Sequence, residues 1–376
     1  MTNPFTPGFG VAPPILAIAG TPVEDFRRAL AAGGGAGRQI LISGMRGTGK
    51  TVLLTQLRVA AHQEGWESIR LHTASEHMAG SLRASAAHLL RGLDPEATTS
   101  HLTAASGSAL GFGGSAGRDI VDRYEDIEEP LHVILDRLTG LLGERGGGLM
   151  IAVDEIQAAD PPQLHEIAQH VQTLVEDARP VSFVGAGLRS GVEDLLTNPS
   201  TTFLRRAHRV ELEVIDVGSA ASTIEMTAAE GGKTMTADAA REAGDISQGY
   251  QYLMQLIGAG AYDAAGDGGT IGLEQVREAE LPAVAEVIKN VHGPALRGIS
   301  ARKMDYLVAM SEDEGPSTVA DIAERMGVDV KYQSVYRDRL LKEDLIRAAG
   351  VGLVEYSLPY LREAIIDKAA GGTRYA

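Results

Sequence analysis

The segment SGMRGTGKT, residues 43–51, constrains the fold more than any other part of the chain. A short apolar run at residues 38–43 precedes it, and residues 51–65 after it have the apolar spacing of an amphipathic helix. Four positions match the pattern G-x-x-x-x-G-K-[ST] of a phosphate-binding loop, or P-loop: Gly44, Gly49, Lys50 and Thr51. A strand, a glycine-rich turn and a helix in this order predict an α/β fold, with a parallel sheet flanked by helices.

The P-loop spacing suits a polyphosphate for physical reasons. Glycines let the backbone wrap closely so that N–H groups point inward, and the helix N-terminus adds partial positive charge. Lys50 is expected to reach the β- and γ-phosphates, and the Thr51 hydroxyl to complete Mg²⁺ coordination. The alternative is a chance glycine-rich turn with an exposed lysine, which the flanking strand and helix disfavour. The predicted nucleotide-binding residues are Gly44, Met45, Arg46, Gly47, Thr48, Gly49, Lys50, Thr51 and Val52.

A second apolar run, Leu149–Val153, is followed directly by Asp154 and Glu155. A continuous apolar run suits a strand that is buried on both faces of a parallel sheet, and ligands bind where such strands end. We expect Asp154 to hold Mg²⁺, and Glu155 to act together with Lys50 in catalysis by polarising the attacking water as a general base. An ordinary strand before an acidic helix start would give the same pair, but the P-loop upstream favours the catalytic interpretation.

Composition excludes several classes of function. The 376 residues have room for two or three domains, and the absence of cysteine rules out disulfides and thiolate chemistry. The net charge of −16 argues against a protein that coats nucleic acid over its whole surface. No apolar run approaches the roughly 20 residues of a membrane span, and the apolar N-terminal stretch at 11–20 contains two prolines. We therefore expect a cytoplasmic protein without a membrane partner.

With these motifs in this order, the chain resembles AAA+ ATPases. It looks most like the initiator branch, which includes archaeal and eukaryotic origin-recognition ATPases, and the related STAND signalling ATPases. The resemblance extends to residues 203–216, where such proteins have a helix ending in arginine before a last strand, and to residues 245–265, which look like their lid helix. It implies a nucleotide-binding core at residues 1–216, an all-α lid at 217–297, ATP or ADP with Mg²⁺ as ligands, and homo-oligomer formation.

The resemblance also marks places where the chain departs from its relatives. Arg205 and Arg206 match the position of an arginine finger, although solvated or structural arginines would look the same. A third predicted strand, residues 179–188, ends in Gly185–Gly187 without the polar side chain that senses the γ-phosphate, and the lid segment at 249–253 brings no arginine or proline. These departures favour slow turnover, or a need for a partner.

Two further segments have a less specific pattern. Residues 14–18 either pack on the adenine or form a plain hydrophobic clasp. The Gly/Ser-rich residues 101–117, between the P-loop helix and the Asp-Glu strand, predict a hairpin, and the acidic run at 122–130 is expected to open the next helix.

The C-terminal part, residues 298–376, predicts a winged helix-turn-helix domain. Helical spacing recurs at residues 301–310, 318–327 and 332–345, and residues 346–358 alternate like two strands around a glycine turn. Thr318 with Asp321 three positions later forms a helix-start signal. Similar domains follow the ATPase core in initiator proteins.

A DNA-binding role for this part is one of two open interpretations. In the DNA-binding version the third helix enters the major groove. From Ile299 onward, however, 11 Lys and Arg face 13 Asp and Glu, a balance of −2, which suits a docking element as well. The chain is thus expected to be a Mg·ATP-dependent ATPase or a nucleotide-held switch that binds DNA or a partner protein. The candidate DNA contacts are Lys331, Gln333, Ser334, Arg337, Arg339 and Arg347.

Overall fold

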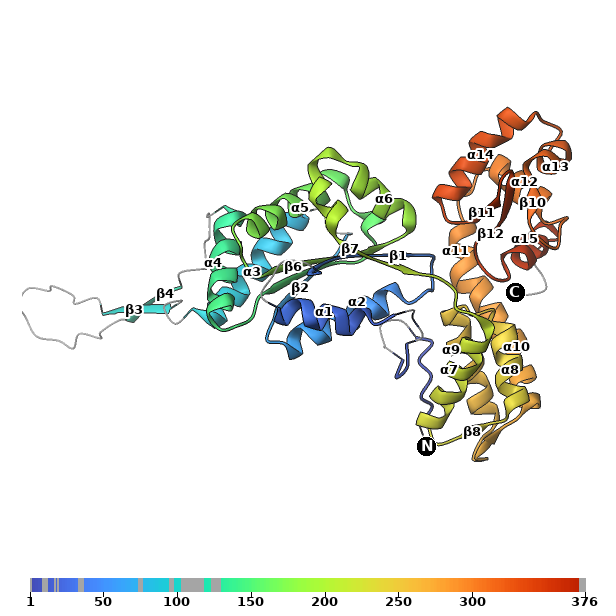
Figure 1. Cartoon of the computed structure of the whole chain (residues 1–376), viewed down its shortest axis with the longest axis horizontal. Coiled ribbons are helices and arrows are strands. Elements are labelled where there is room, and N and C mark those ends of the chain that lie inside the picture. The colour runs from blue at the N-terminus through green and yellow to red at the C-terminus, as the bar shows by residue number, and fades with distance from the viewer. Residues whose placement is uncertain are drawn as a thin grey trace, which may run out of the picture.

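The protein consists of a sheet-containing core followed by two packed modules, as Figure 1 shows. We call residues 217–296 the helical module and residues 301–369 the C-terminal module. The computed structural model describes residues 2–8, 13–16, 18, 20–32, 37–73, 77–94, 98–102, 118–122 and 130–371. Within these ranges, no helix is long and apolar enough to cross a membrane.

The core is built on a five-stranded parallel sheet with the strand order β2-β5-β6-β1-β7. The strands are β1 (Gln39–Gly44), β2 (Glu67–Leu71), β5 (Leu149–Val153), β6 (Val181–Gly187) and β7 (His208–Leu212). Strands β5 and β6 are buried along their whole length, as their continuous apolar sequences predict. This sheet with its flanking helices confirms the predicted α/β P-loop NTPase fold.

Helices cover both faces of the sheet. They are α1 (Pro22–Ala31), α2 (Lys50–Gln63), α3 (Met78–Leu93), α4 (Leu131–Glu144), α5 (Pro161–Glu176) and α6 (Arg189–Thr197). Successive side chains of β1 point to opposite faces, so that Ile40 and Ile42 belong to the core under α1 and α2, whereas Leu41 belongs to the core under α3–α6. The strand therefore joins two cores and carries the P-loop at its end.

The strands and the helix predicted around the P-loop are present, with their ends shifted by one or two residues. The strand expected at 38–43 is β1, the helix expected from residue 51 is α2, and the strand expected at 179–188 is β6. Before β7, the chain forms a 3₁₀ segment, Pro199–Arg206, that ends in the two expected arginines.

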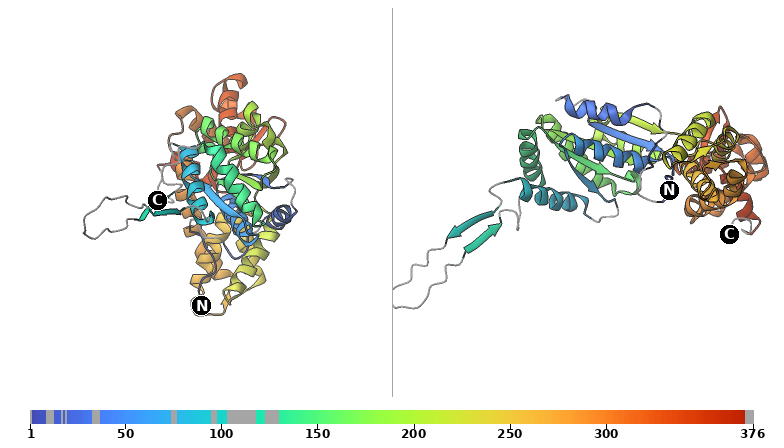
Figure 2. Two further views of the ribbon diagram at one scale, coloured as in Figure 1. Left: turned by 90° about the vertical axis from the view of Figure 1, so that its left-hand side faces the viewer. Right: turned by 90° about the horizontal axis from the view of Figure 1, so that it is seen from below.

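A strand pair extends away from the sheet (Figures 1 and 2). Strand β3 (Thr98–Leu102) pairs antiparallel with β4 (Arg118–Asp122), as the predicted hairpin requires. The remainder of that prediction, residues 103–117, and most of the acidic run, residues 123–129, lie outside the described residues.

The helical module contains α7 (Val217–Glu230), α8 (Ala237–Ser247), α9 (Gln251–Ala264), α10 (Leu273–Val287), a π-helical turn (Ile288–His292) and α11 (Gly293–Leu296). Two short strands, β8 (Thr234–Met235) and β9 (Thr270–Ile271), pair in parallel. The expectation of one helix across residues 245–265 is wrong, because the chain breaks between α8 and α9. Gly249 has φ +71 there, and a Cβ atom would lie 1.8 Å from the carbonyl oxygen of Ile215.

The C-terminal module contains the predicted helices and hairpin. They are α12 (Ala301–Met310), α13 (Val319–Arg325), α14 (Val330–Lys342), β11 (Ile346–Gly350) and β12 (Leu353–Tyr356), followed by α15 (Leu361–Ala369). A short strand, β10 (Ser317–Thr318), completes a sheet of order β10-β12-β11. The helix-start signal is confirmed, because the Thr318 hydroxyl accepts a 3.0 Å hydrogen bond from the backbone N–H of Asp321.

One apolar cluster runs through the helical and C-terminal modules. It includes Leu253 and Ile257 of α9 together with Tyr306 and Leu307 of α12. The Tyr360 hydroxyl also donates to the backbone carbonyl of Ile246 at 2.9 Å. The two modules therefore pack as one continuous body beside the core.

Candidate nucleotide-binding site

The P-loop joins β1 to α2 and encloses the side chain of Lys50. The Lys50 ammonium donates to the carbonyl oxygens of Gly44 at 3.0 Å and Met45 at 2.6 Å, and only 5% of the residue is exposed. Burial lowers the pKa of Lys50, while the neighbouring carboxylates of Glu155, Asp344 and Asp154 oppose that shift. The loop thus places a desolvated cation where a phosphate would bind.

At two P-loop positions only glycine fits, because the backbone is left-handed and a neighbouring side chain occupies the place of a Cβ atom. Gly47 has φ +75, and a Cβ atom there would lie 1.9 Å from the Tyr250 hydroxyl. Gly49 has φ +87, and its Cβ would lie 2.5 Å from the side-chain oxygen of Gln251. Tyr250 and Gln251 begin α9, so the helical module is in direct contact with the loop.

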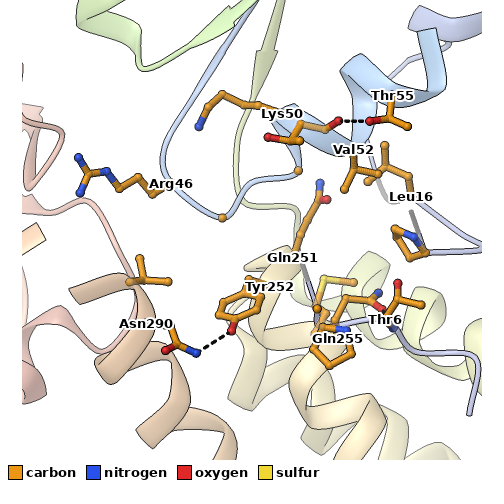
Figure 3. Close-up of a pocket in the computed structure, with 18 of the residues that line it drawn as sticks. Thr6, Leu16, Arg46, Lys50, Val52, Thr55, Gln251, Tyr252, Gln255 and Asn290 are labelled. Atoms are coloured by element: carbon orange, nitrogen blue, oxygen red, sulfur yellow. Dashed lines mark hydrogen bonds between the residues drawn. The ribbon is translucent and has the colours of Figure 1, made fainter. Parts of the chain in front are cut away.

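A cavity of about 340 Å³ opens from the P-loop. Figure 3 shows side chains from three separate parts of the chain around it. The N-terminal segment contributes Thr6, Pro13, Ile15 and Leu16; the P-loop and α2 contribute Arg46, Lys50, Thr51, Val52 and Thr55; the helical module contributes Gln251, Tyr252, Gln255 and Asn290.

The lining of the cavity combines two kinds of side chain. Lys50, Thr51 and Glu155 are polar or charged, whereas Ile15 and Leu16 are apolar. The N-terminal segment is held in place by a 3.0 Å hydrogen bond from the Thr6 N–H to the side-chain oxygen of Gln255. Part of the predicted clasp at residues 14–18 therefore lines the same cavity as the phosphate-binding loop.

Asp154 lies at the end of β5, on the edge of the sheet that carries the P-loop. It is 8% exposed, and its Oδ2 accepts from an Arg70 guanidinium nitrogen at 3.0 Å. The other carboxylate oxygen accepts from the Glu155 backbone N–H at 3.0 Å. The sequence analysis did not identify Arg70 as a site residue. Its one sequence signal is a charged side chain within the β-compatible stretch that forms β2, and β2 pairs with β5.

Glu155 is exposed and adopts a left-handed conformation with φ 53. Its carboxylate accepts a hydrogen bond from the Gln157 side-chain amide. The oxygen of the same amide accepts from the Leu188 backbone N–H at 2.9 Å. Gln157 therefore links the acid to the end of β6, where the sequence shows only small residues.

Close packing around the end of β6 explains why glycine occupies position 187. A Cβ atom at Gly187 would lie 2.7 Å from the Gln157 side-chain oxygen and 2.4 Å from the Ile156 side chain. The position expected to carry a phosphate-sensing side chain is thus occupied by Gln157 from the neighbouring strand end. Gln157, like Arg70, was missed because its role depends on a contact between distant segments.

The two candidate arginine fingers do not line the cavity. Arg205 and Arg206 are both exposed, and the Arg205 Nε donates to the Leu196 backbone carbonyl at 2.9 Å. The structure therefore places the pair on the surface, with Arg205 anchored to the end of α6.

The candidate DNA contacts on α14 and β11 divide into exposed and buried residues. Lys331, Arg339 and Arg347 are exposed, and Ser334 and Arg337 are half-buried. Gln333 corrects the prediction: its side chain is fully buried and therefore cannot reach DNA, because α14 packs against α12 and α13.

Ion pairs reduce the free charge of that face. The Arg337 guanidinium lies 3.0 Å from the Asp338 carboxylate, and Arg347 lies 2.8 Å from Glu355. Large apolar side chains are also exposed on α14, including Val330 and Val335, each 48% exposed.

Comparisons with known proteins agree with this architecture. Residues 21–184 match the family model of the AAA ATPase domain, and residues 289–365 match a model described only as a domain of unknown function. No curated protein matches the chain.

Among solved structures, a Walker-type ATPase of Pyrococcus abyssi is similar at 15% identity and a TM-score of 0.63, over 92% of this chain and 94% of that one. The ORC2 protein of Aeropyrum pernix, solved in ADPNP–ADP complexes, is similar at 14% identity and a TM-score of 0.64, over 98% of each chain. The chain therefore shares its fold with these two proteins, and residues 21–184 match the AAA ATPase domain.

Proposed function

We propose that the chain binds ATP or ADP with Mg²⁺ in the cavity beside the P-loop and hydrolyses ATP slowly. One observation carries the proposal: a single cavity is lined both by the P-loop lysine and Glu155 and by the apolar Ile15 and Leu16. This arrangement matches the two chemical halves of a nucleotide, the phosphates and the base. The similar fold of an ORC2 protein solved with ADPNP and ADP supports the choice of ligand.

We propose Thr51 and Asp154 as the protein side chains that hold Mg²⁺. The hydroxyl and carboxylate oxygens are hard donors, which Mg²⁺ prefers, and Mg²⁺ commonly binds through few protein ligands together with phosphates. In the part of the chain that the structure describes, no group of three or more acidic or histidine side chains could hold a metal alone, which fits an ion held partly by phosphate. When bound, Mg²⁺ would neutralise phosphate charge.

The protein groups around this site have separate proposed roles. Lys50 binds phosphate oxygens, and Glu155 orients and deprotonates the attacking water. Gln157 positions Glu155 through the hydrogen bond between their side chains. Arg205 or Arg206 would act only on a neighbouring subunit of a homo-oligomer, because both lie on the surface away from their own cavity.

Phosphate release tests the hydrolysis step. The wild type and Glu155→Gln are compared at equal nucleotide occupancy, measured by fluorescence of a labelled nucleotide. We expect the rate to fall by about two orders of magnitude or more with binding retained, because general bases contribute about 10²–10⁴-fold. Glu193→Gln, an exposed position on α6, is the control. Equal and negligible rates would reject hydrolysis and leave nucleotide binding.

The alternative is a slow or non-hydrolysing switch that binds DNA or a partner protein through the C-terminal module. We propose that residues 298–376 form a winged helix-turn-helix domain, that residues 217–297 act as a lid, and that residues 1–216 form the nucleotide-binding core. The succession α12, β10, α13, α14 and the β11–β12 hairpin supports the first assignment. Exposed Val330 and Val335 lie on the same helix as the exposed Lys331 and Arg339, which suits a protein partner as well as DNA.

A salt titration separates the two kinds of partner. Binding of a double-stranded DNA probe is measured for the wild type and for Lys331→Ala combined with Arg339→Ala. If α14 contacts DNA phosphates, the double variant binds more weakly and its affinity depends less steeply on salt. Identical curves for both proteins would remove α14 as a DNA-binding helix.

A further inference from the structure

Asp344, in the turn between α14 and β11, is a buried carboxylate from the C-terminal module that faces the core. The residue is only 9% exposed, and its Oδ2 has no hydrogen-bond partner. Its backbone has φ 53, a left-handed conformation that few residues other than glycine adopt but that Asp and Asn tolerate. A left-handed backbone conformation thus holds the carboxylate of Asp344 away from solvent.

Three cations act on the Asp344 carboxylate. They are Arg189, which begins α6, and Lys50 and Arg46 of the P-loop, and the last two also line the nucleotide cavity. Figure 3 shows the Arg46 side chain extending from the P-loop towards the pale red ribbon of the C-terminal module. Asp344 therefore shares its cations with the phosphate end of the cavity.

The Asp344 carboxylate accepts a hydrogen bond from the backbone N–H of Arg189, but the charges around it compensate its burial only in part. The Arg189 guanidinium is already engaged by Glu211 at 2.5 Å and Glu213 at 2.8 Å. Burial raises the pKa of Asp344 despite the opposing effect of Arg189, Lys50 and Arg46, which means that desolvation outweighs the attraction of these cations.

We propose that Asp344 is a built-in competitor for the phosphate end of the nucleotide site, so that nucleotide binding and docking of the C-terminal module against the core oppose each other. The carboxylate and the phosphates need the same two cations, Lys50 and Arg46, and repel each other at short range. Because coupling between two binding events is reciprocal, a docked module weakens nucleotide binding as much as nucleotide weakens docking. This inference rests on the proposed function.

Nucleotide affinity provides the first test. Binding of fluorescent mant-ADP, and of a non-hydrolysable ATP analogue that displaces it, is measured with Mg²⁺ for the wild type and Asp344→Asn. Asparagine keeps the shape and tolerates the left-handed backbone, so that only the charge changes. We expect about tenfold tighter binding to Asp344→Asn, and a larger gain for the triphosphate analogue.

Two further variants control for folding and for general charge. Asp344→Gly keeps the backbone conformation and removes the side chain, and it is expected to bind nucleotide at least as tightly as Asp344→Asn. Asp338→Asn removes one carboxylate from an exposed position on α14, and its nucleotide affinity is expected to stay at the wild-type value.

The position of the module provides the second test. The chain contains no cysteine, so nitroxide labels attach only at introduced sites. With labels at Asp194→Cys on α6 and Lys342→Cys on α14, both exposed positions, electron-electron double resonance measures the distance between core and module. Saturating nucleotide is expected to lengthen the wild-type distance and to leave that of Asp344→Asn unchanged.

The outcomes separate this inference from the proposed function. If nucleotide binds the wild type, Asp344→Asn and Asp344→Gly equally well, with no change in distance, competition by Asp344 is rejected and the nucleotide site stands. If no variant binds nucleotide, the proposed function fails and the inference fails with it. Binding to Asp344→Asn alone would support both.

Discussion

The Tyr250 hydroxyl donates a 2.8 Å hydrogen bond to the backbone carbonyl of Arg46. Tyr250 is fully buried at the start of α9, and Arg46 lies within the P-loop more than two hundred residues earlier. The ring passes over Gly47, the next residue of the loop, where a Cβ atom would lie 1.9 Å from the hydroxyl. The helical module is therefore in direct contact with the P-loop.

We expect Gly47→Ala to destabilise the protein more than a comparable glycine substitution. Alanine at Gly47 meets both a left-handed backbone and the Tyr250 hydroxyl, whereas Gly65 has φ +76 and a Cβ atom there would have no neighbouring atom within 4 Å. Gly65→Ala should cost about 1–2 kcal/mol from backbone strain alone. Gly47→Ala should cost a further 1–3 kcal/mol or so from overpacking. Equal losses in urea unfolding would contradict the close contact.

Arg70→Met should increase the affinity of the nucleotide-bound site for a divalent cation. The Arg70 guanidinium occupies Oδ2 of Asp154, so its removal frees that oxygen for the metal. Electron paramagnetic resonance of Mn²⁺ measures this affinity without reference to turnover. Arg58→Met is the matched control, since the Arg58 Nε contacts the Ser68 hydroxyl at 3.3 Å. An unchanged or weaker Mn²⁺ affinity in Arg70→Met would show that Arg70 does not compete with the metal.

Stability should fall below neutral pH because of His292. Burial lowers the pKa of His292 to about 4 from 6.5, with the Pro359 carbonyl opposing the shift. In the unfolded chain His292 is protonated below about pH 6.5, whereas in the folded chain it stays neutral down to about pH 4. Stability is therefore lost as the pH falls from about 6.5 to about 4. Between pH 7.5 and 5.0 the loss should be roughly 2 kcal/mol.

His292→Gln tests the source of that loss. The variant cannot take up the proton, so its free energy of unfolding should fall by about 2 kcal/mol less than the wild-type value over the same pH range. The imidazole Nε2 lies 2.9 Å from the Pro359 carbonyl oxygen, and a glutamine amide can donate in its place. The same pH dependence in both proteins would assign the loss to other groups.

Gln333→Met should stabilise the C-terminal module. Both polar atoms of the Gln333 side chain are buried without a hydrogen-bond partner, and methionine has a similar length without that desolvation penalty. We expect a gain of about 1 kcal/mol in urea unfolding and no change in DNA binding. A clear loss of stability would mean that the amide is hydrogen-bonded within the folded protein.

The sequence alone was sufficient for features formed within one short segment. The P-loop places its glycines, Lys50 and Thr51 within eight residues, and the buried strand β5 leads directly to Asp154 and Glu155. The N-terminal cap of α13 at Thr318 also forms within one short segment, because the capping hydroxyl and the backbone N–H that donates to it are three residues apart. Hydrophobic spacing also located the helices and hairpin of the C-terminal module.

Only the tertiary structure decided which distant side chains meet around the P-loop. Arg70 reaches Asp154 from a neighbouring strand, and Gln157 fills the space beyond β6 that glycine leaves. Tyr250 and Asp344 approach from the two modules, and no sequence motif marks either residue. Such contacts leave no pattern in a single sequence, because burial and charge pairing depend on packing between segments that are distant in the chain. The P-loop, in contrast, carries its chemistry in its own backbone.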